Sequence, residues 1–521
     1  MVPGDKTINA LQEIDPLRHL RFYRNPGTSK IPDNSLIIIP VVRNKAAKPR
    51  HINFWKKFML IKKGQPITLE ITHLAFGGKG LAKPDGFAIF VDKAVPGDVV
   101  QALITRKKKN YAEARILELL TASPDRIDTP CPYSGHCGGC KWQFLDYEKQ
   151  LVYKRQHVAE ALAHIGGIET VPVHETIPSK RLFGYRNKME FSCSDRRWVL
   201  PNEMDNDDLD RTFALGLHVP GTFNKVIDTE ACLLHPPLGN DILATIRQGM
   251  RHSGLPPYGL KSHAGYWRFV MLRNSAFYGH WMVNIVTSYE NTKAMASLAH
   301  QLMEQYPEVV SVINNITARK SSVAVGESEL LIAGESFFKE KIGSFEFSIS
   351  ANSFFQTNSV GAQTLYDKTR EYAELQGHET VLDLYSGTGT IAIYLAESAR
   401  QIIGIEQVES AVRNAERNCR INQIPNCRFV QGDIKDKLPQ LTEKPQVMVI
   451  DPPRAGMHKD VTQQVLRLAP ERIVYVSCNP ASLARDVALL SEAYDLLEVQ
   501  PVDMFPHTYH IETVAKLVRK L

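Results

Sequence analysis

The sequence contains no apolar run long enough to cross a lipid bilayer. The longest early run, SLIIIPVV at residues 35–42, has eight residues, whereas a membrane-spanning helix needs about 20. The N-terminus also lacks the charged-then-apolar layout of a secretory signal. With 43% hydrophobic and 23% charged residues, the composition is typical of a globular protein with several domains. We therefore expect a cytoplasmic protein with no membrane among its partners.

The main part of the chain has little net charge. The total is +6, but residues 1–60 alone hold 11 Lys and Arg against 4 Asp and Glu. Elsewhere, affinity for nucleic acid would have to come from local patches such as RKKKNYAEAR at 106–115, and a solvated loop explains that stretch equally well. We expect residues 1–64 to be a basic N-terminal extension that is either disordered or a mis-assigned start, with Met59 as the alternative beginning.

Cysteine is also scarce, with eight residues in 521. Cys131, Cys137 and Cys140 lie within ten residues in CPYSGHCGGCKWQ, while the others are scattered. This spacing is poor for a disulfide framework and is typical of a metal or cluster site. The fourth ligand must come from elsewhere, and Cys232 in ACLLHPP is the best candidate. Zinc and an iron–sulfur cluster both accept four thiolates, and the single C-x2-C knuckle favours the cluster.

The pattern of the chain changes three times after the extension. From 65 to 123, short alternating runs between glycines predict a small antiparallel barrel. In the segment 124–350, apolar residues at helical spacing predict a helix over 144–167, and hairpin-like runs predict an antiparallel α+β region. From 351 to 521, strand–helix–strand alternation predicts an α/β domain with a doubly wound parallel sheet.

The α/β segment opens with a glycine turn in VLDLYSGTGTIAIYLA, residues 381–396. Such a turn lets a ligand approach the backbone at the carboxyl edge of a sheet, although glycine turns also join strands to helices for steric reasons alone. The next strand ends at Glu406, which can accept hydrogen bonds from ribose hydroxyls, and a third ends at Asp433, which can face an adenine amino group. These strand ends resemble S-adenosylmethionine-dependent methyltransferases. An NAD-dependent enzyme is the alternative interpretation, but the G-x-G-x-x-G motif usual in such enzymes is absent.

A rigid turn follows the next strand, in VMVIDPPRAG at 447–456. The two prolines fix the backbone at the sheet edge. A similar sequence with an aromatic fourth residue lines the pocket of amino-methylating enzymes, but here that residue is Arg454, which disfavours amino methylation. A rigid turn without a catalytic role is the alternative.

Two further motifs suggest catalytic groups. Cys478 in IVYVSCNPASLARD lies at the end of the strand that follows the Asp-Pro-Pro turn. A lone cysteine is more often a buried hydrophobe, but this location at the carboxyl edge favours a nucleophile. In VDMFPHTYHIETVAKL, His507, His510 and Glu512 could suggest a metal site, yet no further ligand is near in the sequence. Glu512 is better placed as an acid or base, with a surface carboxylate as the alternative.

Together these motifs resemble the RNA 5-methyluridine methyltransferase family (RumA/TrmA type) over residues 65–521. The resemblance includes FFQTN at 354–358, LDLYSGTGT, DPPRAG, SCNPASLARD and DMFPHTYHIE. It implies a Rossmann-like class I S-adenosylmethionine-dependent methyltransferase domain at 351–521. It also implies an N-terminal OB-fold (TRAM) RNA-binding barrel at 65–123 and a central iron–sulfur domain at 124–350. The barrel and the cysteines resemble the ribosomal-RNA branch.

The same resemblance assigns roles residue by residue. It implies a 4Fe-4S cluster held by Cys131, Cys137, Cys140 and Cys232, with Cys478 as nucleophile and Glu512 as base. For S-adenosylmethionine it implies contacts from Gln356, Tyr385, Glu406 and Asp433, with Asp451 as an acid of the active site beside the cofactor. The enlarged interval between Cys140 and Cys232, with its acidic loop at 202–211, departs from the family pattern.

The implied activity is methylation of C5 of a specific uridine in 23S rRNA, by a monomer that binds RNA and not DNA. The thiolate of Cys478 would add to C6 and activate C5 for methylation, and Glu512 would then remove the C5 proton. Aromatic and apolar residues near 504–509 would hold the unstacked uridine. A tRNA uracil-C5 methyltransferase and a non-catalytic iron–sulfur RNA-binding protein are the alternatives. A DNA cytosine methyltransferase is disfavoured, because its nucleophile typically follows proline.

Overall fold

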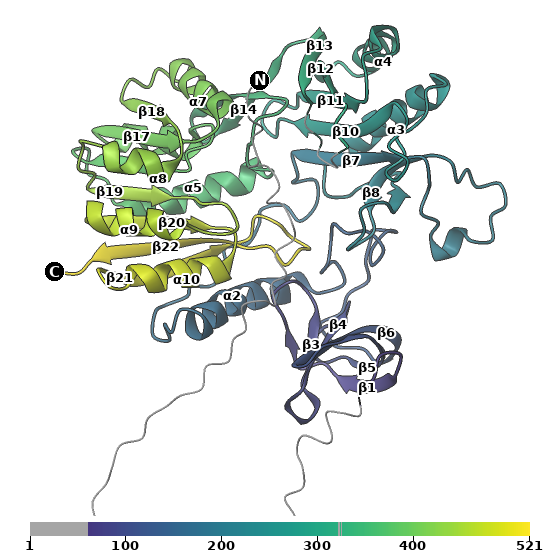
Figure 1. Ribbon diagram of the computed structural model, residues 1–521, viewed down its shortest axis with the longest axis horizontal. Coiled ribbons are helices and arrows are strands. Elements are labelled where there is room, and N and C mark those ends of the chain that lie inside the picture. Colours follow the sequence, from purple (N-terminus) through teal and green to yellow (C-terminus); the bar gives the residue numbers. More distant parts are fainter. Residues whose placement is uncertain (1–60, 321–323, 325) are drawn as a thin grey trace, which may run out of the picture. The chain divides into compact units, whose positions relative to one another are not determined.

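The computed structural model describes residues 61–320, 324 and 326–521 (Figure 1). The predicted basic extension, with its alternative start at Met59, lies outside these residues except for its last four. The chain divides after Ser123 into two compact units, and each is described by itself below. No helix in the described ranges is long and apolar enough to span a membrane.

The first unit is a six-stranded sheet in the order β1-β5-β6-β4-β3-β2. Alternate residues of β5 and β6 are buried, among them Val100, Ile104 and Ala114, as the period-2 pattern predicts. One pair, β4 with β6, is parallel, which the sequence pattern did not indicate. The strands are β1 (Pro66–Glu70), β2 (His73–Leu74), β3 (Gly80–Ala82), β4 (Ala88–Asp92), β5 (Val99–Lys107) and β6 (Tyr111–Thr121).

The second unit begins with the predicted helix, α2 (Tyr147–His164), which starts where Asp146 accepts a hydrogen bond from Lys149 N. A seven-stranded sheet follows, in the order β13-β12-β11-β10-β7-β8-β9. Its strands are β7 (Lys188–Ser194), β8 (Ala214–His218), β9 (Val226–Asp228), β10 (Trp267–Asn274), β11 (Trp281–Thr287), β12 (Val309–Ile316) and β13 (Ser328–Gly334).

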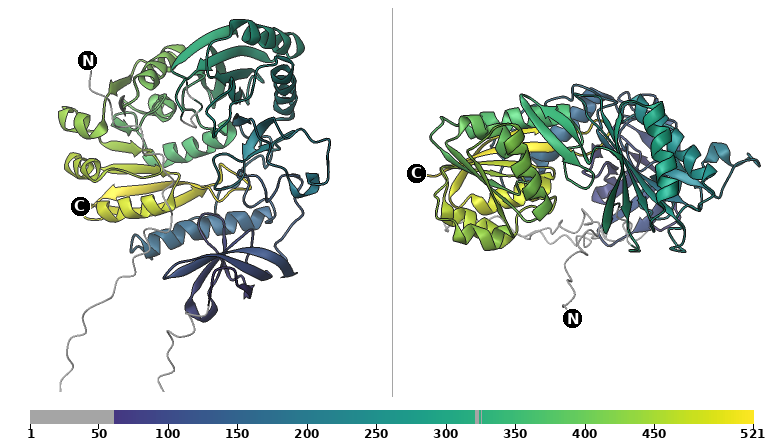
Figure 2. Two further views of the ribbon diagram at one scale, coloured as in Figure 1. Left: turned by 45° about the vertical axis from the view of Figure 1, so that its right-hand side comes forward. Right: turned by 90° about the horizontal axis from the view of Figure 1, so that it is seen from above.

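This central sheet packs its apolar residues against two helices, α3 (Pro237–His252) and α4 (Thr292–Gln305) (Figure 2). The prediction of an antiparallel region is correct for every neighbouring pair except β11 with β12, which is parallel. The connection through α4 explains this pair, because a helical crossover returns the chain in the same direction. A separate hairpin, β14 (Phe337–Ile342) and β15 (Phe345–Ser350), follows.

The last part of the chain is the predicted doubly wound sheet, in the order β18-β17-β16-β19-β20-β22-β21. The strands from β16 to β20 are parallel to one another, and β22 is antiparallel to both β20 and β21. Their bounds are β16 (Thr380–Leu384), β17 (Gln401–Glu406), β18 (Cys427–Gln431), β19 (Val447–Ile450), β20 (Arg472–Ser477), β21 (Tyr494–Val502) and β22 (Glu512–Arg519).

Helices cover both faces of this sheet, which explains why its strands are apolar throughout. Val381 packs in the core on the side of α5, α6 and α7, whereas Leu382 packs in the core on the side of α2, α8, α9 and α10. The helices are α5 (Ser359–Ala373), α6 (Thr390–Leu395), α7 (Glu409–Ile421), α8 (Ile434–Lys437), α9 (Lys459–Leu468) and α10 (Pro480–Leu490). Short 3₁₀ turns lie at Pro84–Gly86, Pro201–Glu203, Ala396–Ser398 and Leu438–Gln440.

Candidate active site

The candidate site lies at the edge where the parallel strands of the doubly wound sheet end (Figure 1). Ligands of open α/β sheets bind in the crevice at this edge. Five residues singled out from the sequence occur there: Tyr385 after β16, Glu406 at the end of β17, Asp433 after β18, Asp451 after β19 and Cys478 after β20. The strand rhythm therefore brings these positions to one edge, as expected.

Glu512 reaches the same edge because the last strand runs in the opposite direction. β22 pairs antiparallel with β20, and Ser477 lies opposite Thr513. Cys478 follows Ser477 and Glu512 precedes Thr513, so the strand pairing places the two side by side. The charge of Glu512 acts directly on the Cys478 thiol. The residues predicted as nucleophile and base therefore share one site.

The Cys478 thiol is half-buried and close to charged groups of both signs. Burial raises its pKa to about 12, and the carboxylates of Glu512 and Asp451 contribute to the increase. The guanidinium of Arg454 acts in the opposite direction and lowers the pKa. The thiol is consequently neutral at physiological pH until a base removes its proton.

The two carboxyl groups beside this thiol are also strongly perturbed. The Glu512 residue is 6% exposed, and burial together with the charge of Asp451 raises its pKa well above the usual range. Burial raises the pKa of Asp451 to about 7. A carboxylate with a pKa near 7, as at Asp451, can accept a proton near neutral pH. The site thus combines a thiol with two carboxyl groups whose pKa values are raised.

Arg454 and His510 form a pair at the mouth of the site. The Arg454 guanidinium donates to His510 Nδ1 at 3.3 Å, and its carbonyl oxygen accepts from Asn479 Nδ2 at 2.9 Å. Burial, with the neighbouring charge of Arg454, lowers the pKa of His510 to about 3. His510 is therefore a neutral acceptor that orients the guanidinium. Within the described ranges, no group of three His, Cys, Asp or Glu is arranged to hold a metal ion.

The glycine turn after β16 leaves open space beside the backbone. Tyr385 and Gly387 both have positive φ angles, 62° and 55°, and a Cβ at Gly387 would meet nothing within 4 Å. Gly389, with φ +76°, packs so closely that a Cβ would lie 2.8 Å from Phe429 Cζ. Glu406 stabilises the turn, because its carboxylate accepts from Gly387 N at 2.9 Å. This geometry suits a ligand that approaches the main chain closely.

A buried acid, Asp383, lies directly beneath the turn. Its Oδ2 accepts a 2.6 Å hydrogen bond from Ser386 Oγ, but its buried Oδ1 has no partner. Burial raises the pKa of Asp383 to about 7, and the charges of Asp451 and Glu406 contribute to the increase. An unpartnered buried carboxylate oxygen is unfavourable in an empty fold. The backbone N–H of Ala392 favours the charged form of this carboxylate but does not offset the effect of burial on its pKa.

The other predicted ligand contacts lie around the turn with less specific geometry. Asp433 caps α8 by accepting from Lys435 N at 3.1 Å, so its local role is structural. Gln356 is half-buried, and its carbonyl oxygen accepts from Asn187 Nδ2 of the central region at 2.9 Å. The neighbouring Phe354 is 70% exposed. Phe354 lies next to the turn, because its carbonyl oxygen accepts from Thr388 Oγ1 at 3.5 Å.

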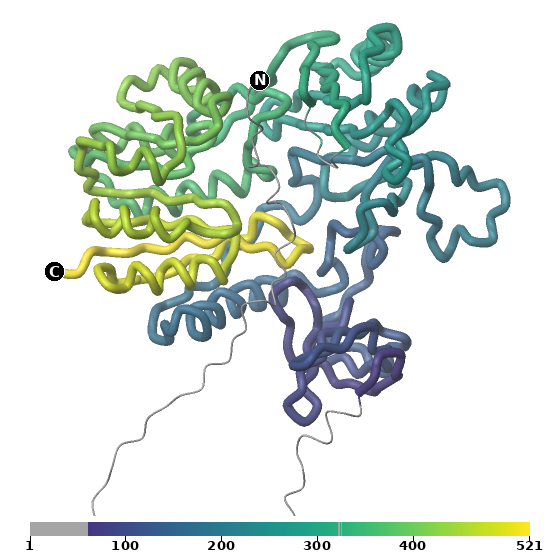
Figure 3. Tube along the Cα trace, viewed as in Figure 1, coloured from purple at the N-terminus to yellow at the C-terminus, as the bar shows by residue number. Residues whose placement is uncertain are grey.

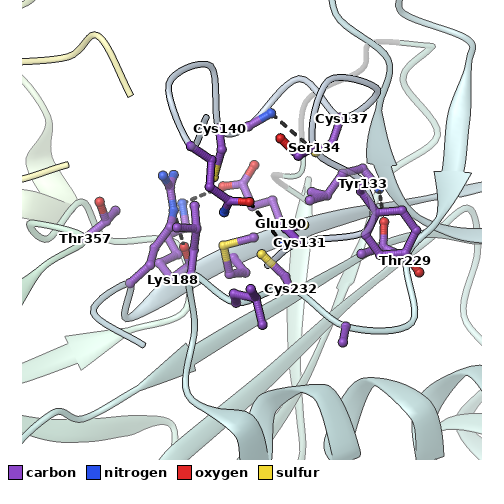
Figure 4. Close-up of a pocket in the computed structure, with 18 residues that line it drawn as sticks. Cys131, Tyr133, Ser134, Cys137, Cys140, Lys188, Glu190, Thr229, Cys232 and Thr357 are labelled. Atoms are coloured by element: carbon purple, nitrogen blue, oxygen red, sulfur yellow. Dashed lines mark hydrogen bonds and ion pairs between the residues drawn. The ribbon is translucent and has the colours of Figure 1, made fainter. Parts of the chain in front are cut away.

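The four cysteines predicted as ligands line one cavity of about 290 Å³ (Figure 4). Cys131, Cys137 and Cys140 lie between β6 and α2, and Cys232 follows β9. Burial raises the pKa of the Cys140 thiol, and the charges of the other three cysteines contribute. The four sulfurs are thus electrostatic neighbours that surround a space, which suits a group larger than a single ion.

Backbone N–H groups point at these sulfurs. Cys137 Sγ accepts from Gly139 N at 3.3 Å. Two backbone N–H groups near Cys131 and two near Cys232 lower the pKa values of these thiols by the same kind of hydrogen bond. Hydrogen bonds to the charged form stabilise thiolates, and such bonds to cluster sulfurs are usual in iron–sulfur sites. These donors are of the kinds that a four-thiolate cluster uses, but within the described ranges the four cysteines do not form a group arranged to hold a metal ion.

Sequence reasoning did not assign Asp383 to the site, although a charged residue in a buried run is unusual and offered a signal. It named Arg454 and His510 but did not predict that they pair, because the pairing depends on two loops that are distant in sequence. Of the residues near 504–509 that were predicted to hold the uridine, Met504 and His507 are buried, whereas the aromatic Phe505 and Tyr509 are half-buried.

Comparison with known proteins gives consistent matches. Residues 289–520 match the tRNA (uracil-5-)-methyltransferase family, and residues 61–117 match the TRAM domain. An uncharacterized RNA methyltransferase of Chlorobaculum tepidum is 46% identical over 465 residues, 87% of this chain and 96% of that protein. One from Porphyromonas gingivalis is 39% identical over 463 residues, 87% of this chain and 99% of that protein. The Pyrococcus abyssi tRNA (uracil-54, C5)-methyltransferase, in complex with S-adenosyl-L-homocysteine, has 30% identity and a TM-score of 0.69, and the match covers 87% and 99% of the two chains.

Proposed function

The chain belongs to the tRNA (uracil-5-)-methyltransferase family, an S-adenosylmethionine-dependent RNA methyltransferase, and we propose that it methylates C5 of a specific uridine in 23S rRNA through a covalent adduct with Cys478. The observation that carries this proposal is the pairing of β20 with β22, which brings Cys478 and Glu512 together at the edge that holds the glycine turn.

The methyl donor would lie along the turn at 385–389. Its ribose hydroxyls would face Glu406 and its adenine would face Asp433, while the unpartnered oxygen of Asp383 suits the ammonium group. Gln356 and Asp451 would border the reactive end of the donor. S-Adenosylmethionine supplies an electrophilic methyl group, and the residues of the turn orient it.

Cys478 supplies the activation that uracil needs. C5 of uracil is too weak a nucleophile to take a methyl group unaided, and addition of the thiolate to C6 makes C5 an enolate carbon. Because the resting thiol is neutral, its proton first moves to a base, and we assign this role to Asp451, whose pKa of about 7 suits it. The carbon–sulfur bond forms as the C5–C6 π bond breaks, and C5 then accepts the methyl group.

Glu512 completes the reaction. After methyl transfer C5 carries both a proton and the new methyl group, and the Glu512 carboxylate removes that proton. The C5–C6 double bond returns, the C6–S bond breaks, and the thiolate recovers its proton from Asp451. The exposed ring of Phe354, next to the turn, would stack against the unstacked uracil.

The four-cysteine cavity would hold a 4Fe-4S cluster on Cys131, Cys137, Cys140 and Cys232. Its contribution is structural, since no step of the reaction needs an electron. The backbone N–H groups of Lys141 and Trp142, directly after Cys140, donate to His507 O at 3.0 and 2.9 Å. The cysteine segment therefore holds the loop that leads to Glu512.

The RNA would contact the first unit as well. The hairpin between β5 and β6 carries four exposed basic residues in a row, Arg106 to Lys109, which suits phosphate contacts. The cysteine cavity and the TRAM domain support 23S rRNA as the substrate. A tRNA uridine is the second candidate, favoured by the likeness to the Pyrococcus abyssi tRNA enzyme over most of both chains.

The test is mass-spectrometric mapping of 5-methyluridine in rRNA and tRNA from cells with and without the gene. The proposal predicts loss of a single rRNA site, restored by the wild-type gene and not by Cys478→Ala. Loss confined to tRNA would replace the substrate and keep the chemistry. Full methylation with Cys478→Ala would refute the covalent mechanism.

A further inference from the structure

The loop at 503–511, which joins β21 to β22, leads directly to Glu512 (Figure 3). It carries His510, the acceptor for Arg454, and its first residue, Asp503, is buried. Loop residues of an active site normally need support from rigid elements to keep a catalytic group in place. The support here comes from α2, a helix more than 300 positions earlier in the chain.

Lys154 of α2 makes the central contact. Its side chain and that of Asp503 are both 0% exposed, and Lys154 Nζ lies 2.6 Å from Asp503 Oδ1. The same ammonium donates to Phe505 O at 3.1 Å, and Phe505 N donates to Asp503 Oδ1 at 2.9 Å. Tyr147 OH donates to the second carboxylate oxygen at 3.0 Å. One lysine thus fixes both the side chain and the main chain at the start of the loop.

The hydrogen bonds continue from this point towards the catalytic groups. Thr508 Oγ1 donates to Phe505 O at 2.8 Å, and His510 N donates to Thr508 Oγ1 at 3.2 Å. His510 Nδ1 in turn accepts from Arg454. The carbonyl of Phe505 is therefore shared between Lys154 and the part of the loop that ends beside Cys478.

A buried ion pair is an unusual means of stabilising a fold. Removing two charges from water is costly, and replacing such a pair by apolar residues is often neutral or stabilising. Stability alone therefore gives little reason for a lysine on the α2 face that packs against the doubly wound sheet. The directional bonds of an ammonium to one carboxylate and one carbonyl, in contrast, define the position of a loop.

We propose that Lys154 and Asp503 are positioning residues of the methyl-transfer site: through the loop at 503–511 they set the places of His510 and Glu512. The inference rests on the proposed function of Cys478 and Glu512 and extends it to a helix that contributes no catalytic residue. Lys154 touches none of the reacting atoms, and its effect is transmitted through Phe505.

The test compares two variants of the full-length protein, Lys154→Met and the double variant Lys154→Met/Asp503→Asn. The single variant leaves a buried carboxylate without its partner and lowers the melting temperature. The double variant removes both charges, so its melting temperature returns towards that of the wild type. Because the bond to Phe505 O is lost in both, we expect kcat to fall about 100-fold in both, as for a misplacement of roughly 1 Å.

Three further readouts separate positioning from general damage. The Kd for S-adenosylmethionine should stay within about twofold, because the turn at 385–389 is untouched. Hydrogen exchange should increase over 503–511 and not over 381–396. Leu302→Ala, which truncates a fully buried side chain of α4, serves as the matched control: it should lower the melting temperature without changing exchange in the loop.

Recovery of kcat together with the melting temperature in the double variant would overturn the proposal, as would unchanged exchange over 503–511. A wild-type protein that methylates no RNA uridine would overturn the proposed function instead. In that event exchange in the loop, which needs no substrate, still decides whether Lys154 fixes it.

Discussion

Arg454 offers the sharpest test of the site, because its guanidinium acts directly on the Cys478 thiol and lowers its pKa. A thiol with a pKa of about 12 is ionised in roughly one molecule in 30,000 at pH 7.5, against about one in 30 at the ordinary value of 9.0. Replacing the guanidinium by an uncharged chain in Arg454→Met should reduce this small population further, since the pKa of Cys478 then rises.

The magnitude follows from the exposure of the guanidinium. An opposite charge within about 4–6 Å changes a pKa by about 1–3. Arg454 is an exposed residue, so solvent screens its charge. The lower end of the range of pKa changes therefore applies. We therefore expect a loss of about 1.4 kcal/mol in thiolate stabilisation, which is a tenfold decrease in the thiolate population.

Two assays report this population. Alkylation of Cys478 by iodoacetamide, followed by peptide mass spectrometry, measures the thiolate directly and should slow about tenfold at pH 7.5. Adduct formation with RNA that contains 5-fluorouridine measures addition and methyl transfer without the final elimination, and it should slow by a similar factor. Arg454→Lys keeps the positive charge and should restore most of both rates.

Arg413 supplies the matched control. It is an arginine of the same half of the chain whose guanidinium pairs with Glu409 on an exposed face of α7, so Arg413→Met should leave both rates unchanged. Alkylation and adduct formation at wild-type rates in Arg454→Met would refute the assignment of the guanidinium to the thiolate. Loss of both rates in Arg454→Lys would indicate that the shape of the side chain matters and not its charge.

Four other outcomes are expected. Glu512→Gln should lower turnover about 10²–10⁴-fold, the usual contribution of a general base, and a denaturing gel should show accumulation of the protein–RNA adduct. Gly389→Ala should weaken S-adenosylmethionine binding in calorimetry by at least tenfold, since φ +76° and the 2.8 Å approach to Phe429 leave no room for a methyl group. Cys140→Ser should remove the visible absorption and most of the iron and sulfide of anaerobically purified protein, whereas retention of one zinc would contradict the cluster. Asp383 binds a proton more tightly in the folded state, with a pKa of about 7 against 3.8 unfolded. Its ionisation therefore destabilises the free protein progressively as the pH rises from about 4 to 7. Asp383→Asn should raise the melting temperature at pH 7.5 and not at pH 4, and it should weaken S-adenosylmethionine binding.

The sequence determined the architecture of the last 170 or so residues with little ambiguity. Apolar strands that alternate with helices require a parallel sheet covered on both faces, and the ends of such strands meet at one edge. That rule alone placed Tyr385, Glu406, Asp451 and Cys478 together. It failed for Asp433 in part, since the side chain of Asp433 caps α8, and a strand-end position does not specify where a side chain points.

Within the central region the sequence pattern predicted the strands but not their directions. The pattern of a half-buried strand is the same whether its neighbour is parallel or antiparallel, so the parallel pair of β11 and β12 could not be read from it. The cysteine spacing predicted three ligands on one short loop. It offered Cys232 as the best candidate for the fourth ligand, and the cavity that all four line depends on the turn after β9.

Only the tertiary structure decided which groups act on one another. The antiparallel return of β22 brings Glu512 to Cys478, and the packing of α2 brings Lys154 to Asp503. Hydrophobic periodicity extends over one element at a time and carries no information about such distant pairs. The pKa values of Cys478, Glu512 and Asp383 likewise follow from burial and from charges contributed by several strands and loops. The sequence thus specified the residue types and placed them at the carboxyl edge of the sheet, and the tertiary structure decided which of them interact.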